Sequence, residues 1–328
     1  MILVTGGAGF IGSNLVAALV ARGDRVAVAD WLGTEGKWRN LAKHPPETVV
    51  LPEALESWLD ARELRAVIHL GAISETTATD GDMVWQTNVE LSWRLWEWCT
   101  REHTPFLYAS SAATYGAGEA GFDDAPSRLA ALRPLNLYGW TKHAFDLRVT
   151  AALARGELAP PRWAGLKFFN VYGPNEYHKG SMISVVKRKF DERRAGSRAK
   201  LFASDVPGLA DGHQARDFIW VGDVVDVLLW LLNAPEAPQG PPSGIYNLGT
   251  GRARTYLDLA FAVCDAMGAG RWVEFVPMPE SLRGQYQSFT EARMDRLRAA
   301  GYPGQFTPLE DGVRRYVQDY LAQPDAYA

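Results

Sequence analysis

A glycine-rich turn near the start of the chain restricts the possible folds more than any other feature. The short apolar run at residues 2–4 leads into Gly6-Gly7-Ala8-Gly9-Phe10-Ile11-Gly12, after which apolar side chains recur at helical spacing. A second strand pattern follows at residues 25–30. This order predicts a parallel βαβ unit that binds a dinucleotide, because glycines permit positive φ and close approach of the backbone to a pyrophosphate. The helix N-terminus adds partial positive charge.

The order of elements along the rest of the chain predicts an α/β fold. Strand patterns at residues 66–70, 106–110 and 164–169 alternate with helical patterns at 83–101 and 139–154. Such alternation is typical of a doubly wound parallel sheet of the Rossmann type. The pattern breaks after residue 170, which predicts a smaller mixed α/β lobe for the substrate. We therefore expect a dinucleotide-binding domain at 1–170, with later strand returns near 216–223 and 245–249, and a mainly substrate-binding lobe at 171–328.

Composition excludes several classes of protein. The chain has 328 residues, 47% of them hydrophobic, and a formal net charge of −4, which disfavours disorder and disfavours nucleic-acid binding through overall positive charge. No apolar run approaches the roughly 18 residues of a membrane span, and the N-terminus does not resemble a signal peptide. Cys99 and Cys264 are far apart and fit reduced thiols of a cytoplasmic protein better than a disulfide or a metal site.

The end of the second strand indicates which dinucleotide is bound. Asp30 stands where a carboxylate usually accepts the adenosine ribose hydroxyl of NAD. Lys37 and Arg39 follow closely, and a cation there favours the 2′-phosphate of NADP. The alternative is that both are solvated loop charges. We expect NADP, with NAD left open.

A tyrosine and a lysine four residues apart supply the chemistry. Tyr138 and Lys142 fall on one face of a predicted helix. A lysine cation lowers the pKa of a neighbouring phenol, so the tyrosine can act as a general base, while the lysine also holds the nicotinamide ribose. Ser111, at the end of a strand, can bond the same reacting oxygen. The pair is common on helices by chance, but after a dinucleotide turn it indicates catalysis.

These motifs together resemble the extended short-chain dehydrogenase/reductases, the superfamily of nucleotide-sugar epimerases and dehydratases. The resemblance covers nearly the whole chain, with matching stretches at residues 106–116, 134–139, 169–174, 178–182, 216–223, 247–252 and 283–290. The stretch His178-Lys179-Gly180-Ser181-Met182 narrows it to the family of ADP-glyceromanno-heptose 6-epimerases of lipopolysaccharide biosynthesis. The resemblance implies an ADP-heptose substrate and a homo-oligomer, pentameric in that family.

The resemblance also implies contacts residue by residue. Trp31 stands where the family commonly has asparagine. Cofactor contacts are implied for Gly6, Gly9, Phe10, Ile11, Gly12, Asp30, Trp31, Lys37, Leu70, Gly71, Ala72, Ile73, Ser74, Asn88, Lys142, Val171 and Lys179. Substrate contacts are implied for Asn170, Ser181, Arg188, Phe202, Ala203, Ser204, Asp205, Arg216 and Tyr286. The two arginines have an independent reason, because guanidinium groups bind diphosphates well.

Inversion at an exocyclic carbon needs two acid/base groups. Oxidation to a ketone, rotation about the adjacent C–C bond and reduction from the other face move the oxygen to a different side of the pocket. One group cannot reach both positions. Tyr138 is one catalytic residue, and Lys179, in a loop with Gly180, is the candidate for the other; the alternative is a surface lysine.

Three other functions are compatible with parts of this pattern. A 4,6-dehydratase typically has Asp-Glu after the active-site Ser or Thr, whereas Ala112 and Ala113 stand here. A UDP-hexose 4-epimerase stays open and would give Lys179 no chemical duty. A non-catalytic NAD(P)-binding sensor is a further alternative, although such proteins tend to lose the tyrosine or the lysine.

The tryptophan-rich helix at 85–98 is expected to form a core or a subunit contact.

Overall fold

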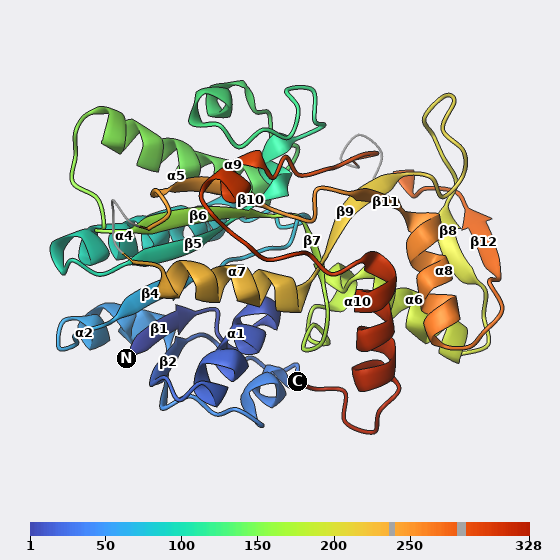
Figure 1. The fold of residues 1–328 in the computed structure, drawn as a ribbon, viewed down its shortest axis with the longest axis horizontal. Helices are drawn as coiled ribbons and strands as arrows, with labels where there is room; N and C mark the ends of the chain where they lie inside the picture. Colours follow the sequence, from blue (N-terminus) through green and yellow to red (C-terminus); the bar gives the residue numbers. More distant parts are fainter. Residues whose placement is uncertain (236–239, 281–286) are drawn as a thin grey trace.

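Seven parallel strands form the large sheet of the computed structural model, which describes residues 1–235, 240–280 and 287–328 (Figure 1). Their order across the sheet is β10-β6-β5-β4-β1-β2-β3. The strands are short, apolar and almost entirely buried, as expected for a sheet covered on both faces. Their bounds are β1 Ile2–Thr5, β2 Val26–Ala29, β3 Thr48–Val50, β4 Ala66–His69, β5 Phe106–Ser111, β6 Trp163–Phe168 and β10 Gly244–Leu248. The predicted doubly wound sheet is confirmed.

Helices cover both faces of this sheet. Alternate side chains of β1 point to opposite faces: Ile2 and Val4 pack with α1 and α7, whereas Leu3 packs with α4 and α5. Trp96 of the tryptophan-rich segment is 1% exposed and belongs to the second of these cores. The helices on this sheet are α1 Phe10–Ala21, α2 Leu55–Leu59, α3 Gly81–Trp85, α4 Leu91–Arg101, α5 Leu137–Ala154 and α7 Val221–Asn233, and a π-helical turn, Gln86–Glu90, joins α3 to α4.

The strand order reverses beside β1, and this places the site. The chain runs outward from β1 through β2 to β3 on one side, and through β4, β5 and β6 on the other. At such a reversal the loops after neighbouring strands diverge and leave room at their carboxyl ends, where open α/β sheets bind ligands. The glycine-rich turn follows β1 and therefore lies there.

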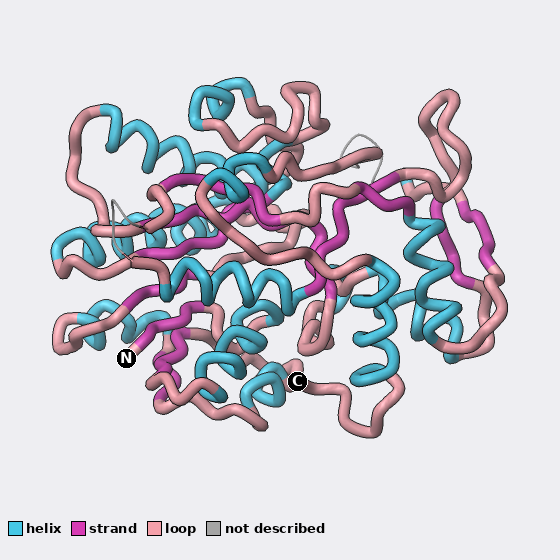
Figure 2. The backbone as a smooth tube through the Cα atoms, in the orientation of Figure 1, coloured by secondary structure: helices cyan, strands magenta, loops and turns pink. Residues whose placement is uncertain are grey.

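The later part of the chain builds two smaller sheets, grouped with their helices beside one end of the large sheet (Figures 1 and 2). The first has the order β11-β9-β7, and the second pairs β12 with β8. The strand expected near 245–249 lies in the large sheet as β10, whereas the segment expected near 216–223 gives a strand of the three-stranded sheet. The elements are β7 Asn170–Tyr172, α6 Val185–Arg194, β8 Ala199–Phe202, β9 Ala215–Trp220, β11 Ala253–Thr255, α8 Tyr256–Ala266, β12 Val273–Val276, α9 Asp295–Ala299 and α10 Leu309–Arg315.

Two further expectations concern membranes and thiols. Among the residues that the structure describes, no helix is long and apolar enough to span a bilayer. Cys99 and Cys264 are both buried and unpaired with each other. Burial raises the pKa of the Cys99 thiol, so this sulfur stays protonated and unreactive.

Candidate active site

The glycine turn is shaped by close backbone contacts. Gly6 has φ of 66°, and a Cβ there would lie 2.6 Å from the backbone nitrogen of Gly71. A Cβ on Gly12 would lie 2.1 Å from the carbonyl oxygen of Gly6, so helix α1 packs on the turn only without a side chain. A Cβ on Gly9, the residue that caps α1, would meet only the carbonyl oxygen of Gly6, at 3.1 Å. This bare, N-terminal stretch of backbone fits a pyrophosphate.

Asp30 and Lys37 form a pair at the end of β2. Asp30 is 6% exposed; its Oδ2 accepts from the Ala8 backbone N–H at 2.9 Å and its Oδ1 lies 2.6 Å from Lys37 Nζ. The same ammonium donates to the Trp31 carbonyl at 3.0 Å. The Trp31 ring is 46% exposed beside them, and its Nε1 donates to Glu53. The sequence predicts that the Asp30 carboxylate accepts a ribose hydroxyl. In the structure the Lys37 ammonium already offsets part of the negative charge of this carboxylate.

The loop at 70–74, which follows β4, is fixed by Asn88. Asn88 Oδ1 accepts from the Ile73 N–H at 2.9 Å, and its Nδ2 donates to the Ile73 carbonyl at 3.0 Å and to Thr141 Oγ1 at 3.1 Å. Asn88 is fully buried, so its amide ties the 70–74 loop to helix α5.

A buried polar chain behind this loop was not predicted from the sequence. His69 Nε2 lies 2.8 Å from Ser92 Oγ, and its Nδ1 lies 2.6 Å from Thr5 Oγ1. Because Ser92 donates its one hydrogen to the Asn88 carbonyl, it accepts from His69 Nε2, which makes Nδ1 the acceptor from Thr5. Burial, aided by Lys142, lowers the pKa of His69 to about 3. The sequence signal for this buried chain is His69 itself, a polar residue at the carboxyl end of an apolar strand.

Helix α5 brings Tyr138 and Lys142 together as predicted. The side chain of Asn136 caps the helix by accepting from the Gly139 N–H at 2.9 Å. Tyr138 forms a side-chain hydrogen bond with Ser111, which ends β5. Lys142, one turn along, is 3% exposed.

The electrostatics of this pair differ from the sequence-based expectation. We expected Lys142 to lower the pKa of the phenol. Instead burial raises the pKa of Tyr138, and the hydrogen bond from Ser111 is the interaction that opposes it. Burial also lowers the pKa of Lys142 to about 8, opposed by Asp146 one turn further along. Sequence spacing shows the pairing of residues but not how deeply they are buried, and desolvation dominates here.

Lys179 lies against the start of helix α1. Its Nζ is 5.3 Å from the ring centroid of Phe10, the first residue of α1, in a cation–π arrangement. Burial lowers the pKa of Lys179, and Glu176 opposes this shift. Glu176 is itself fully buried, where its carboxylate accepts from Ser184 Oγ, the Ser184 N–H and the Tyr316 hydroxyl. Lys179 itself is half-buried rather than fully exposed.

The predicted substrate residues come from several elements. Arg188, exposed on α6, donates through Nη2 to the Ser181 carbonyl, so these two lie together. Arg216 on β9 is 5% exposed, with its guanidinium 5.6 Å from the Tyr256 ring. The other predicted substrate residues are Asn170 on β7 and Phe202, Ala203, Ser204 and Asp205 at and after the end of β8. The predicted cofactor residues Ile11 and Val171 lie on α1 and β7. Tyr286 lies outside the described residues.

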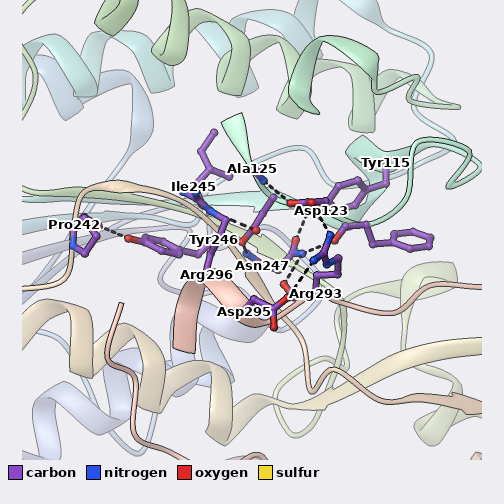
Figure 3. A network of polar contacts seen from close by, with 12 residues as sticks. Tyr115, Asp123, Ala125, Pro242, Ile245, Tyr246, Asn247, Arg293, Asp295 and Arg296 are labelled. Carbon is purple, nitrogen blue, oxygen red and sulfur yellow. Dashed lines mark hydrogen bonds and ion pairs between the residues drawn. The ribbon is translucent and has the colours of Figure 1, made fainter. Parts of the chain in front are cut away.

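Asn247 is a second residue whose role the sequence did not show. At the end of β10 it accepts from the Tyr115 hydroxyl at 2.6 Å and donates through Nδ2 to the carbonyls of Phe122 and Arg293 (Figure 3). Its backbone N–H donates to Asp124 at 2.7 Å. Since Tyr115 closes the short helix that follows Ser111, this network fixes one wall of the site.

Comparison with known proteins agrees with this geometry. The model of the "NAD dependent epimerase/dehydratase family" matches residues 2–249. A curated Nitratidesulfovibrio vulgaris protein named ADP-L-glycero-D-manno-heptose-6-epimerase is 46% identical over 332 residues, covering 100% of both chains. The Helicobacter pylori structure of that name has a TM-score of 0.79 at 26% identity and covers 97% of this chain and 95% of its own. A Thermus thermophilus UDP-glucose 4-epimerase in complex with NAD has a TM-score of 0.72 at 28% identity, covering 95% and 96%.

Proposed function

The chain belongs to the NAD-dependent epimerase/dehydratase family and, within it, to the ADP-L-glycero-D-manno-heptose-6-epimerases, and from this premise we propose how its residues work. The protein epimerises ADP-D-glycero-D-manno-heptose to ADP-L-glycero-D-manno-heptose by transient oxidation at C6″. Tyr138 and Lys179 are the two acid/base residues. The observation that carries this proposal is the position of the half-buried Lys179 beside the ring of Phe10, at the same turn that would hold the dinucleotide.

NADP is the cofactor that the Asp30–Lys37 pair favours. The carboxylate has its two oxygens engaged by the Ala8 N–H and by the Lys37 ammonium, which leaves less capacity for a ribose hydroxyl. An ammonium at this position suits a 2′-phosphate. A bound nicotinamide would supply the hydride acceptor and return the same hydride to the opposite face of the ketone.

Tyr138, Ser111 and Lys142 serve one position of the reacting oxygen. The phenol, whose pKa is raised by burial, is the proton donor in one direction and, as phenolate, the acceptor in the other. Ser111 bonds to the phenol and can bond the same substrate oxygen. Lys142, with a pKa of about 8, carries positive charge at neutral pH and offsets the negative charge that develops on the phenolate.

Lys179 serves the second position of that oxygen. An exocyclic C6″ presents its other face after rotation about the neighbouring C–C bond, which carries the oxygen away from Tyr138. The lowered pKa of Lys179 brings its neutral, proton-accepting form closer to physiological pH. A hexose 4-epimerase would have no use for this group, so Lys179 favours the heptose reaction.

The remaining assignments concern the ADP-sugar and the assembly. Arg188 and Arg216 present guanidinium groups suited to the substrate diphosphate, with Asn170, Ser181 and residues 202–205 around the sugar and nucleoside. Residues 1–170 form the cofactor domain and residues 171–328 mainly the substrate lobe. We infer that the enzyme works in the cytoplasm as a homo-oligomer, pentameric as the sequence resemblance implies, and light scattering of the purified protein measures the subunit number.

Lys179→Met tests the two-base mechanism directly. The variant should bind NADP normally and lose interconversion of the two epimers by about 100-fold or more, as should Tyr138→Phe. Proton NMR of the heptose product measures the conversion and distinguishes inversion at C6″ from inversion at C4″. Lys187→Met, a lysine on α6 paired with Asp191, is the control and should keep wild-type turnover.

Two results would contradict the proposal. Wild-type turnover by Lys179→Met would leave the mechanism without its second base. Deuterium at C6″ after turnover in D₂O would indicate proton abstraction, since a hydride held on the cofactor never exchanges with solvent.

A further inference from the structure

The loop that carries Lys179 is attached to the cofactor turn by side chains rather than by a sheet. It follows β7, which belongs to the three-stranded sheet, whereas the phosphate turn follows β1 of the large sheet. The two parts of the site therefore sit on different frameworks. Whatever joins them decides where the Lys179 amine lies relative to the dinucleotide turn.

Three asparagines make this join, and we refer to Asn14, Asn40 and Asn175 as the asparagine clamp. Asn14 Nδ2 donates to the carbonyls of Phe10 at 2.9 Å and Pro174 at 3.0 Å, and so connects the first turn of α1 to the start of the loop. Asn175 Nδ2 donates to Ser13 Oγ at 3.0 Å. The contacts of Asn14 with Pro174 and of Asn175 with Ser13 span 160 and 162 residues in sequence, so they define tertiary placement rather than local structure.

Asn40 has the central place in the clamp. Its Nδ2 donates to the carbonyl of Ala8, in the phosphate turn, at 2.9 Å and to the carbonyl of Asn175, in the loop, at 3.1 Å. The same nitrogen lies 3.3 Å from Nδ1 of His178, the residue before Lys179. Asn40 is 3% exposed, so these bonds form away from water and a lost donor leaves buried carbonyls unsatisfied.

Ala8 links this join to the cofactor end of the site. Its carbonyl accepts from Asn40, and its N–H donates to Asp30 at 2.9 Å, the carboxylate that also holds Lys37. A single residue of the turn, Ala8, thus connects the adenosine-binding end to the base-bearing loop. An amide is required at residue 40, because a carboxylate offers no donors to the two carbonyls.

The backbone of Asn175 shows that the join is under conformational constraint. Its φ is 72°, and among the non-glycine residues that the structure describes only His103 also has a positive φ. Asparagine tolerates this region better than most residues, yet the conformation still costs free energy. It turns the Asn175 carbonyl to Asn40 while the side chain reaches Ser13.

We propose that Asn40 is a positioning residue that holds the Lys179 loop on the phosphate turn and thereby places the amine for its half of the reaction. This inference rests on the proposed role of Lys179. Asn40 bonds to the phosphate turn and to the Lys179 loop and offers no acid or base of its own, so its loss should affect the proton transfer served by Lys179 and spare the one served by Tyr138. A purely structural residue would affect both equally.

The test measures the two half-reactions separately. Enzyme loaded with NADP is mixed rapidly with each pure epimer, and the reduced cofactor is followed at 340 nm. Lys179→Met identifies the epimer whose oxidation needs Lys179. With that epimer Asn40→Ala should react about 100-fold more slowly than wild type, and with the other epimer it should stay within about twofold.

A second variant and a control keep the test interpretable. Asn175→Gly preserves the positive φ and removes the bond to Ser13, so it should show the same selective loss even where Asn40→Ala folds poorly. Thr307→Val removes one partly buried hydrogen bond to Asp223, at 2.8 Å and away from the site, and should lower thermal stability without selectivity between epimers.

The outcomes separate this inference from the function it rests on. Equal slowing with both epimers, or wild-type rates with both in Asn40→Ala and Asn175→Gly while Lys179→Met stays selective, would overturn the role of Asn40 alone. If Lys179→Met itself oxidises both epimers at the wild-type rate, the proposed role of Lys179 fails instead.

Discussion

Three lysines of the site differ in charge environment although they are the same residue type. Lys37 is paired with Asp30 at 2.6 Å, Lys142 is buried one turn before Asp146, and Lys179 is half-buried beside the ring of Phe10. Burial disfavours the cation, and a neighbouring carboxylate restores it. The three therefore suit three duties: binding an anion, stabilising a phenolate and exchanging a proton.

Lys37→Ala should shift the cofactor preference. Without the ammonium, the 2′-phosphate of NADP loses its cation and Asp30 is freed for the ribose hydroxyl of NAD. We expect the KM for NADP to rise about 10- to 100-fold, as for a lost charged hydrogen bond, while the KM for NAD stays the same or falls. Steady-state kinetics with both cofactors measure this. Arg39→Ala, whose guanidinium lies against Trp38, is the matched control and should change the ratio less; equal losses with both cofactors would contradict the assignment.

At the scale of elements, the catalytic helix is held by a buried ion pair. Asp146 of α5 lies 2.6 Å from Lys167 of β6, and both side chains are fully buried. Asp146 also accepts from Ser110 at 2.7 Å, and Lys167 donates to Thr114 at 2.7 Å. Tyr138, Lys142 and Asp146 are spaced by one turn each, so the pair fixes the face of α5 that carries the chemistry.

Losing both charges of this pair should cost less stability than the two single losses add up to. Asp146→Asn leaves the Lys167 ammonium buried without a counter-charge. Lys167→Met likewise leaves the Asp146 carboxylate buried without a counter-charge. Each single change should cost about 3–5 kcal/mol of unfolding free energy. The double variant should lose less than the sum, by about 1–3 kcal/mol. Urea unfolding measures all three; additive losses would show that the pair does not act as a unit.

The sequence predicted those elements whose signals are local. Glycines at fixed offsets, apolar strands and the spacing of Tyr138 and Lys142 all depend on neighbours within a few residues, and the large sheet and the catalytic helix follow from them. The bonds of Asn40 to Ala8 and to Asn175 join segments about 30 and 135 residues apart, and no local pattern marks them. The raised pKa of Tyr138 escaped prediction for a related reason, since burial is a property of the folded chain.

At the scale of the whole molecule, residues from distant parts of the chain close the fold around β10. Asp124, Asn247 and Arg293 meet there, and Arg296 of α9 lies 3.5 Å from Asp124 (Figure 3). The segment after β5, the last strand of the large sheet and the chain after residue 290 are thus held by one polar network. Its charge state should influence unfolding of the entire domain.

Asp124→Asn should change how stability depends on pH. Burial raises the pKa of Asp124 to about 6, from an unfolded value of 3.8. A raised pKa means that the stability contributed by the protonated acid is complete below about pH 4 and is lost as pH rises through about 6. The asparagine amide does not ionise. Between pH 4 and 7 the free energy of unfolding of Asp124→Asn should therefore rise relative to that of wild type by up to about 3 kcal/mol. Urea unfolding across this range measures the difference. Asp124→Ala also lacks the acceptor for the Asn247 N–H. Its free energy of unfolding should therefore depend on pH as that of Asp124→Asn does, but be lower at every pH. A difference from wild type that does not change with pH, for both variants, would show that Asp124 is ionised throughout.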